Sequence, residues 1–231
     1  MKKAADMTRL ELASYIDQSV LKPEFTQAEI KRYIQEGIDY GCKTVCINPA
    51  SLPLAKILCA NSKTLICVVS DFPFGLSDSA SKVAQAAHIL SQGGVDEVDV
   101  VANYGHIKSG LWDNVKAELK AVADACHSKG AILKVILETD ALTLEETIKG
   151  TQVICDAEAD YAKTSTGFYT GGPSLGATPE VIQAMLQAAN HRCKIKASGG
   201  IRTRERFFEL IDLGIDRAGI GYKSTPVVIG I

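Results

Sequence analysis

The sequence lacks a Cys-x-x-Cys pair, a long hydrophobic run and a marked excess of one charge. Its formal net charge of −2 offers no broad basic surface for nucleic acid, so any phosphate site must be local. No apolar run approaches the length of a membrane span, and the residues after Met1 are polar and helix-like, unlike a signal peptide. We therefore expect a cytoplasmic protein with neither nucleic-acid nor membrane partners.

The cysteines are scattered, and several lie within apolar runs, as Cys67 does in 65–69. A free cysteine behaves as a small apolar side chain, whereas a zinc site needs closely spaced soft ligands. The histidines show no such spacing and are expected in helices or loops. We therefore expect reduced, buried cysteines and neither a metal nor another cofactor. The residues concerned are Cys42, Cys46, Cys59, Cys67, Cys126, Cys155, Cys193, His88, His106, His127 and His191.

The composition is that of an ordinary globular protein, with 46% hydrophobic and 23% charged residues. A length of 231 residues is usual for one barrel domain, so we predict a single domain spanning 1–231. A chain of this length buries well over half of its unfolded surface and needs no disulfide or metal to hold it together.

Short runs rich in Val, Ile and Leu alternate with longer segments of helical period, which indicates a parallel sheet covered by helices. The expected strands are 17–21, 44–47, 64–69, 97–102, 132–137, 161–164, 194–197 and 217–220. The expected helices are 8–16, 26–39, 52–60, 79–92, 111–128, 144–157, 178–190 and 204–213.

Helix starts and stops agree with this division. Thr26 and Glu29 form a capping box, and Thr178 precedes Pro179 at a first helical position. Eight strands with interleaved helices predict an α/β (β/α)8 TIM barrel, with an extra N-terminal helix before the first strand. An open doubly wound sheet is the alternative. Its dinucleotide-binding version is weakened because no Gly-x-Gly-x-x-Gly turn follows an early strand.

Charged residues interrupt the apolar strands near their carboxyl ends, where barrel enzymes carry their reactive groups. Asp99, Lys163 and Lys196 are the principal cases, and each needs a partner because a lone buried charge is costly. One interpretation is a structural ion pair. The other is catalytic: neighbouring strands lie about 4.8 Å apart, so two lysines would repel and at least one would have a lowered pKa. A free amine can add to a carbonyl, and a carboxylate can move the protons.

Glycine-rich turns follow the last strands. Gly199 and Gly200 come after the seventh strand and Gly221 after the eighth, while Gly167 opens the longest loop, 167–177. Loops after strands seven and eight are the usual phosphate cradle of this fold, because their N–H groups face the anion. The same glycines would also suit ordinary tight turns.

The motifs together resemble the deoxyribose-phosphate aldolase family over nearly the whole chain. The matching stretches are 17–23, 44–49, 72–75, 96–101, 134–139, 162–168 and 196–202; Lys-Thr-Ser-Thr-Gly at 163–167 and Lys-Ala-Ser-Gly-Gly at 196–200 are the most specific. The resemblance implies a barrel fold and reversible cleavage of 2-deoxy-D-ribose 5-phosphate to acetaldehyde and D-glyceraldehyde 3-phosphate, with no cofactor. It also implies a homodimer or homotetramer.

The resemblance further implies residue roles. Lys163 matches the Schiff-base lysine, Lys196 the second lysine that tunes it, and Asp99 the carboxylate of the proton relay. Asp17, Cys46 and Thr166 match positions near the substrate.

The chain departs from the family pattern where the phosphate is expected. Tyr222 and Lys223 stand in place of a serine pair, and the loop 171–176 is longer than usual. Little sequence remains after the last strand for a closing helix. A different sugar phosphate or a non-phosphorylated aldehyde is therefore an alternative substrate. A phosphosugar isomerase or epimerase is an alternative activity.

Overall fold

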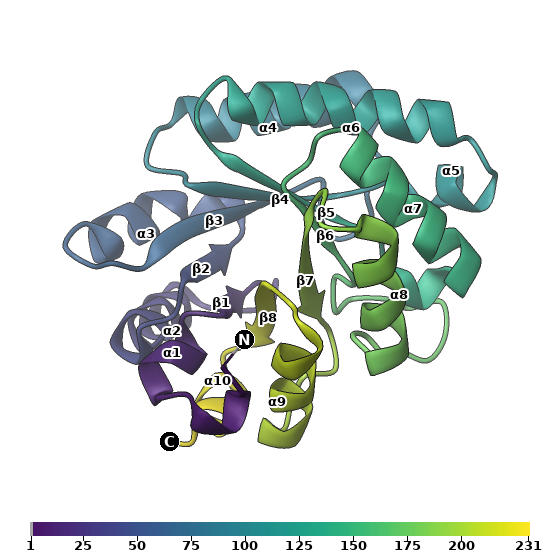
Figure 1. Ribbon diagram of the computed structural model, residues 1–231. Helices are drawn as coiled ribbons and strands as arrows, with labels where there is room; N and C mark the ends of the chain where they lie inside the picture. Colours follow the sequence, from purple (N-terminus) through teal and green to yellow (C-terminus); the bar gives the residue numbers. More distant parts are fainter. Residues whose placement is uncertain (1) are drawn as a thin grey trace.

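The computed structural model describes residues 2–231. Eight parallel strands close into a barrel in sequence order, with helices around it (Figure 1), which confirms the predicted (β/α)8 fold. The strands are β1 Ile16–Val20, β2 Thr44–Ile47, β3 Leu65–Ser70, β4 Glu97–Val101, β5 Ile132–Ile136, β6 Tyr161–Lys163, β7 Lys194–Ser198 and β8 Arg217–Gly221. The helices are α1 Arg9–Ala13, α2 Gln27–Tyr40, α3 Leu52–Cys59, α4 Ser79–Ser91, α5 Tyr104–Lys108, α6 Trp112–His127, α7 Leu144–Asp156, α8 Pro179–Ala189, α9 Arg204–Leu213 and α10 Thr225–Ile229.

The N-terminal segment carries the expected extra helix, but that helix is shorter than predicted. A 3₁₀ turn, η1 (Ala4–Asp6), precedes α1, and α1 ends before Ser14. The prediction that the helix continues to Ile16 was wrong. Ile16 is instead the first residue of β1 and pairs with Ala218 of β8. The pairing of β1 with β8 that closes the barrel therefore places Ile16 in a strand, although local periodicity assigned it to the helix.

Helix ends follow the capping chemistry in the sequence. The Thr26 hydroxyl accepts the Glu29 N–H, and the Glu29 side chain accepts the Thr26 N–H, so two otherwise unpaired donors are satisfied. Thr178 caps α8, whose first residue is Pro179. Short elements without such signals were missed, namely α5, α10, η2 (Pro49–Ser51) and η3 (Thr139–Ala141).

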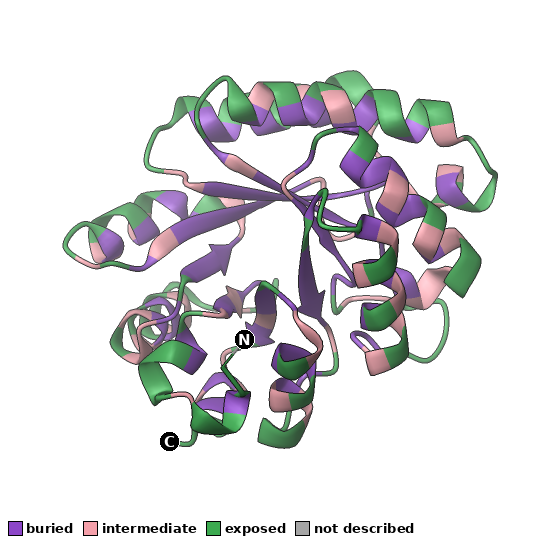
Figure 2. Cartoon of the chain, in the orientation of Figure 1, coloured by how far each residue is buried: buried purple, intermediate pink, exposed green. Residues whose placement is uncertain are grey.

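Most strand residues are buried, including neighbours whose side chains point to opposite faces, and Figure 2 colours the strands mostly purple. In β4, Val98 and Val100 belong to the apolar layer between strands and helices, where α6 contributes Leu119. The alternate residues, Glu97 and Asp99, are fully buried and form ion pairs with lysines of other strands. Apolar residues thus pack the helices, while the barrel interior holds charge.

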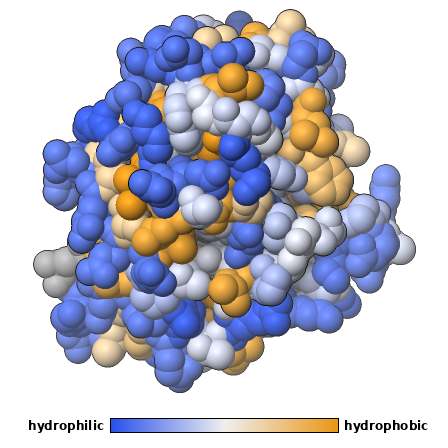
Figure 3. All heavy atoms as spheres, turned by 90° about the vertical axis from the view of Figure 1, so that its right-hand side faces the viewer, coloured by the Kyte–Doolittle hydropathy of each residue, from blue (hydrophilic) through white to orange (hydrophobic). Residues whose placement is uncertain are grey.

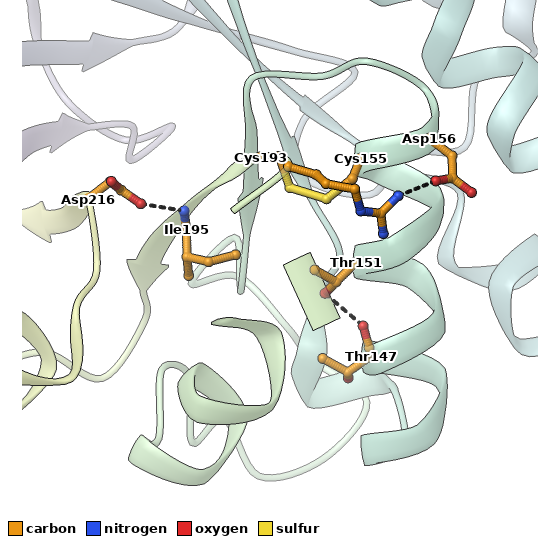
Figure 4. The surroundings of a disulfide bond; sticks show 8 residues. Thr147, Thr151, Cys155, Asp156, Cys193, Ile195 and Asp216 are labelled. Atoms are coloured by element: carbon orange, nitrogen blue, oxygen red, sulfur yellow. Dashed lines mark hydrogen bonds and ion pairs between the residues drawn. A yellow bond between two sulfur atoms is a disulfide. The ribbon is translucent and has the colours of Figure 1, made fainter. Parts of the chain in front are cut away.

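The prediction that all the cysteines are reduced was wrong for two of them. Cys155 at the end of α7 and Cys193 just before β7 form a disulfide across a sequence separation of 38 residues (Figure 4). Their Cα atoms lie 5.4 Å apart because consecutive βα units place these segments side by side. The other five cysteines are free and buried, as expected.

Within residues 2–231, no helix combines the length and apolar character needed to cross a bilayer.

Candidate active site

The barrel register brings the charged strand residues together. Lys163 of β6 pairs in register with Lys196 of β7, as predicted for lysines on neighbouring strands. Asp99 of β4 pairs in register with Lys134 of β5. Side chains at these positions alternate between the helices and the barrel axis. Lysines from three consecutive strands therefore reach the carboxylate of a fourth.

Asp99 is the centre of this network. Its Oδ1 lies 2.7 Å from Lys134 Nζ, and its Oδ2 lies 2.7 Å from Lys163 Nζ and 2.8 Å from Lys196 Nζ. The Cys67 thiol also donates to Oδ1 at 3.2 Å. Both carboxylate oxygens are consequently occupied by cationic or polar donors.

Further charges surround this centre. The Asp17 carboxylate lies 2.6 Å from Arg217 Nη1 and 2.5 Å from Lys196 Nζ. The Glu97 carboxylate lies 2.6 Å from Lys134 Nζ and 3.1 Å from Arg217 Nη1. The three carboxylates Asp17, Glu97 and Asp99 are matched by the three cations Lys134, Lys196 and Arg217. Each carboxylate of this network therefore has a cationic partner other than Lys163.

Burial and pairing act in opposite directions on these groups. Desolvation disfavours the Asp99 carboxylate, but the ammonium groups of Lys134, Lys163 and Lys196 outweigh it and hold the pKa of Asp99 well below its ordinary range. Desolvation likewise disfavours the Lys196 cation, yet Asp17 and Asp99 raise the pKa of Lys196. Lys196 is thus not the lysine whose pKa was expected to fall by lysine–lysine repulsion, because its carboxylate neighbours dominate.

A cavity of about 360 Å³ opens above this network. Lys163, although only 3% exposed, lines it, whereas Lys134 and Lys196 are fully buried below. Five of the residues expected at the site also line the cavity: Thr166, Gly167, Gly199, Gly200 and Gly221. Asp17 and Cys46, expected near the substrate, do not line it and are fully buried.

The lining of the cavity suits an anion. Lys22, Arg202 and Lys223 line it, and the described lining contains no carboxylate. Gly199 and Gly200 have φ values of 86° and 73°, a left-handed backbone that favours glycine. A Cβ on Gly200 would lie 2.6 Å from the Leu175 carbonyl, so only glycine fits against the neighbouring loop.

Tyr222, the bulky departure from the family pattern, packs into an aromatic cluster. Its ring lies 3.8 Å from that of Tyr33 and 5.2 Å from that of Phe25, measured between centroids. Both partners come from the β1–α2 region, on the side of the barrel next to β8. The tyrosine is therefore held by packing, while Lys223 beside it also lines the cavity.

The donor atoms of Cys46, Cys67 and Asp99 lie within 4.8 Å of one another, which is close enough for a shared metal ion. Two features oppose that role. Burial raises the pKa of the Cys67 thiol well above its ordinary value, and a bound cation would face the three ammonium groups around Asp99.

Several residues of the site were not among the expected ones. Lys134 and Glu97 were visible as charges within strands, but nothing local distinguished their contribution. Arg217 begins β8 and gave no signal, since a charged residue at a strand end is usually exposed. Glu138 was visible as a charge at the end of the fifth strand but received no role; it is 2% exposed and accepts hydrogen bonds from the backbone N–H and the hydroxyl of Thr166.

The fold and the site define a class: a closed parallel barrel with a lysine amine at the floor of a cavity, able to bond covalently to a carbonyl compound. Comparison with known proteins agrees. The family model described as DeoC/LacD family aldolase matches residues 12–224. The chain therefore belongs to the DeoC/LacD aldolase family, whose members are lyases.

Relatives and solved structures extend over almost the whole chain. The deoxyribose-phosphate aldolase of Finegoldia magna is 40% identical over 91% of this chain and 95% of its own length. The deoxyribose-phosphate aldolase of Dictyoglomus turgidum is 41% identical over 92% of this chain and 94% of its own length. A putative deoxyribose-phosphate aldolase from Coccidioides immitis superposes with a TM-score of 0.88 at 33% identity, covering 96% of this chain and 86% of its own. A tetrameric deoxyribose phosphate aldolase from Aeropyrum pernix superposes with a TM-score of 0.84 at 28% identity, covering 96% of this chain and 91% of its own.

Proposed function

We propose that this chain reversibly cleaves 2-deoxy-D-ribose 5-phosphate to acetaldehyde and D-glyceraldehyde 3-phosphate through an imine on Lys163. The single observation that carries the mechanism is the position of that amine. Of the three lysines bonded to Asp99, only Lys163 lines the cavity. Every carboxylate of the network has a cationic partner other than Lys163, so none depends on Lys163 alone for its pairing.

Lys163 would attack the aldehyde carbon of the open-chain sugar and lose water to form the imine. The protonated imine then accepts the electron pair of the C2–C3 bond, which leaves acetaldehyde attached as its enamine. Asp17 and Asp99 raise the pKa of Lys196, so Lys196 begins the reaction protonated and supplies positive charge beside Lys163. We assign Asp99 and Lys196 to proton transfers at the imine nitrogen and at C2.

The phosphate would bind in this cavity. The backbone N–H groups around Gly167, Gly199, Gly200 and Gly221 offer hydrogen bonds, and Arg202 and Lys223 add charge. In this proposal Lys223 replaces the hydroxyl groups of the expected serine pair. Asp17 and Cys46 are fully buried and do not line the cavity, so in this proposal they support the charged network and make no direct contact with the substrate.

Borohydride reduction in the presence of acetaldehyde tests the proposal. We expect a stable adduct on Lys163, located by peptide mass spectrometry, and none on Lys134 or Lys196. An adduct on another lysine, or no adduct, would overturn the assignment. An isomerase or epimerase would need no lysine nucleophile and would survive borohydride with its substrate present.

A Schiff-base aldolase of different specificity is the second candidate. It is favoured by Tyr222 and Lys223 at the phosphate end. Specificity constants for the sugar with and without its 5-phosphate distinguish the two. A large preference for the phosphorylated sugar supports our proposal, whereas equal constants support the second candidate.

We also propose that the protein is a homodimer or homotetramer, supported by the tetrameric relative from Aeropyrum pernix. Phe74 and Leu76, in the loop after β3, are 47% and 69% exposed and could lie in such an interface. The face that carries α7 and α8 has only scattered apolar groups among hydrophilic ones (Figure 3), so we expect the interface elsewhere. Light scattering on the purified protein tests this, and a monomer at micromolar concentration would contradict it.

A further inference from the structure

Cleavage of the C2–C3 bond requires a base that the network around Asp99 does not readily supply. The hydroxyl on C3 must lose its proton as C3 becomes a carbonyl carbon. No carboxylate lines the cavity among the residues that the structure describes, so the proton must leave through a relay. Asp99 is a weak acceptor for it, because the ammonium groups of Lys134 and Lys196 and the cationic nitrogen of Lys163 hold its pKa low.

A second buried carboxylate lies beside the cavity. Glu138 follows β5, is 2% exposed and has a φ of 58°, a left-handed backbone that costs energy outside glycine. Its carboxylate accepts hydrogen bonds from the Thr166 N–H, at 3.3 Å, and from the Thr166 hydroxyl. Thr166 in turn lines the cavity together with Lys163. A strained acid is therefore joined to the cavity by one hydroxyl group.

The hydrogen bonds of Thr166 suit proton transfer. Its hydroxyl donates to Glu138 and accepts the Phe168 N–H at 3.0 Å, which leaves one lone pair of the oxygen free. A hydroxyl with a base behind it and a free lone pair in front can take a proton as it gives its own away.

The charges that face Glu138 favour such a base. Burial raises the pKa of its carboxyl, and the hydrogen bonds from Thr166 only partly offset this. Asp140, two residues along, raises it further, whereas Lys163 lowers it. Tyr104 is the other titratable group whose ionisation is affected by Glu138. Glu138 thus has a more basic carboxylate than Asp99.

We propose that Thr166 and Glu138 form the proton relay that deprotonates the C3 hydroxyl of the substrate, a step that rests on the function proposed above. Thr166 Oγ1 takes the hydroxyl proton while its own proton moves to Glu138 Oε2. The released O–H electron pair forms the new C=O bond, the C2–C3 pair forms the C1=C2 bond of the enamine, and the imine π pair moves to nitrogen. Thr166 and Glu138 return the proton when the reaction runs in the direction of synthesis.

Two activities of the enzyme, cleavage and hydrogen exchange, distinguish the role of this relay from that of Lys163. Cleavage needs the C3 hydroxyl to be deprotonated. Exchange of the methyl hydrogens of acetaldehyde for deuterium uses the imine and enamine on Lys163 but involves no C3 hydroxyl. Enzymatic cleavage rates and proton NMR of acetaldehyde in D2O measure the two.

We expect Glu138→Gln and Thr166→Val to lose about 10²- to 10⁴-fold in cleavage, while methyl exchange stays within about threefold of wild type. Thr166→Ser keeps the hydroxyl and should restore cleavage to within about tenfold. Thr151→Val is the matched control, since Thr151 bonds only the Thr147 carbonyl within α7 (Figure 4) and lies outside the cavity lining.

The pH profile gives a second readout. In wild type, kcat/KM for cleavage should fall at acidic pH as Glu138 is protonated, and in Glu138→Gln this limb should disappear. An equal loss of cleavage and methyl exchange in Glu138→Gln would show that Glu138 has only a structural role. Unimpaired cleavage in Thr166→Val would also overturn the relay. If the wild type shows neither exchange nor borohydride trapping, the proposed aldolase function itself fails.

Discussion

Among single residues, Lys163 differs from Lys134 and Lys196 by its place in the barrel as well as by its partners. All three bond Asp99, yet only Lys163 touches the cavity. Lys134 and Lys196 each have a second carboxylate, Glu97 and Asp17 respectively. Position therefore distinguishes the amine that can meet a substrate from those that set the charge around it.

Substitution of the two lysines tests this division. Lys163→Ala should abolish both cleavage and acetaldehyde exchange, because no imine can form. Lys196→Ala should lower kcat by several orders of magnitude, since it removes both charge and a proton donor. Lys163→Arg is the matched control, keeping a cation but no nucleophile. Steady-state assays check this, and near-wild-type turnover in Lys196→Ala would refute its role.

Glu138 gives a prediction about stability, because its pKa is raised in the folded protein. Such a group contributes stability that is fully present below its unfolded pKa, about 4.3, and is lost as pH rises through the folded value. The neutral Glu138→Gln should therefore melt no lower than wild type at pH 7 and unfold with less dependence on pH. Thermal melts at pH 4 and pH 7 measure this. A lower melting temperature at pH 7 would show that the carboxylate stabilises the fold.

At the level of elements, the long loop between β6 and α8 is fixed to its neighbours at two points. Asp140 accepts the Leu175 and Gly176 N–H groups, each at 2.9 Å. Gly176, with a φ of 66°, packs against the Gly199 backbone. The loop is therefore held by the segments that follow β5 and β7, and it helps to position the proposed phosphate site.

Gly176→Ala tests the coupling of this loop to the site. A Cβ there would lie 2.3 Å from Gly199 carbonyl atoms, so Gly199 must move and the KM for the phosphorylated sugar should rise about tenfold or more. Gly93→Ala is the control, because Gly93 also has a positive φ but nothing within 4 Å of its added Cβ. Both changes should cost some stability, whereas only the first should raise KM. Equal KM values would separate the loop from binding.

For the whole molecule, the charged barrel interior predicts how the protein responds to acid. Burial disfavours the carboxylates of Asp17 and Asp99, yet the surrounding cations hold both pKa values low. These groups contribute stability that is fully present above the unfolded value, about 3.9, and is lost as pH falls toward the folded values. Urea unfolding at pH 5 and pH 3 should show a marked loss. Asp17→Asn should lose less between these two pH values, and an unchanged loss would contradict the assignment.

The disulfide predicts a second global property. A link across 38 residues restricts the unfolded chain and should contribute about 4 kcal/mol to the free energy of unfolding. Reduction, or Cys193→Ser, should lower that free energy, as urea titration with and without reductant would measure. Cys126→Ser, which alters a free buried cysteine, is the control. Reductant should have no effect on stability once Cys193 is replaced.

The sequence alone determined the barrel, because its signals are local. Alternating apolar runs, the capping box at Thr26 and the cap and proline at Thr178 and Pro179 each act within a few residues. The same locality placed Lys163 and Lys196 on neighbouring strands. Gly199 and Gly200 after the seventh strand were likewise located, since their left-handed backbone favours glycine.

Only the tertiary structure decided what these residues meet. Lys134, Glu97 and Arg217 are ordinary charges until the barrel closes and excludes water, after which each must find a partner. The same closure buried Asp17 and Cys46 beneath the cavity, joined Cys155 to Cys193 and placed Glu138 behind Thr166. Contacts between distant segments depend on the packing of the whole chain, and no local pattern in a single sequence records them.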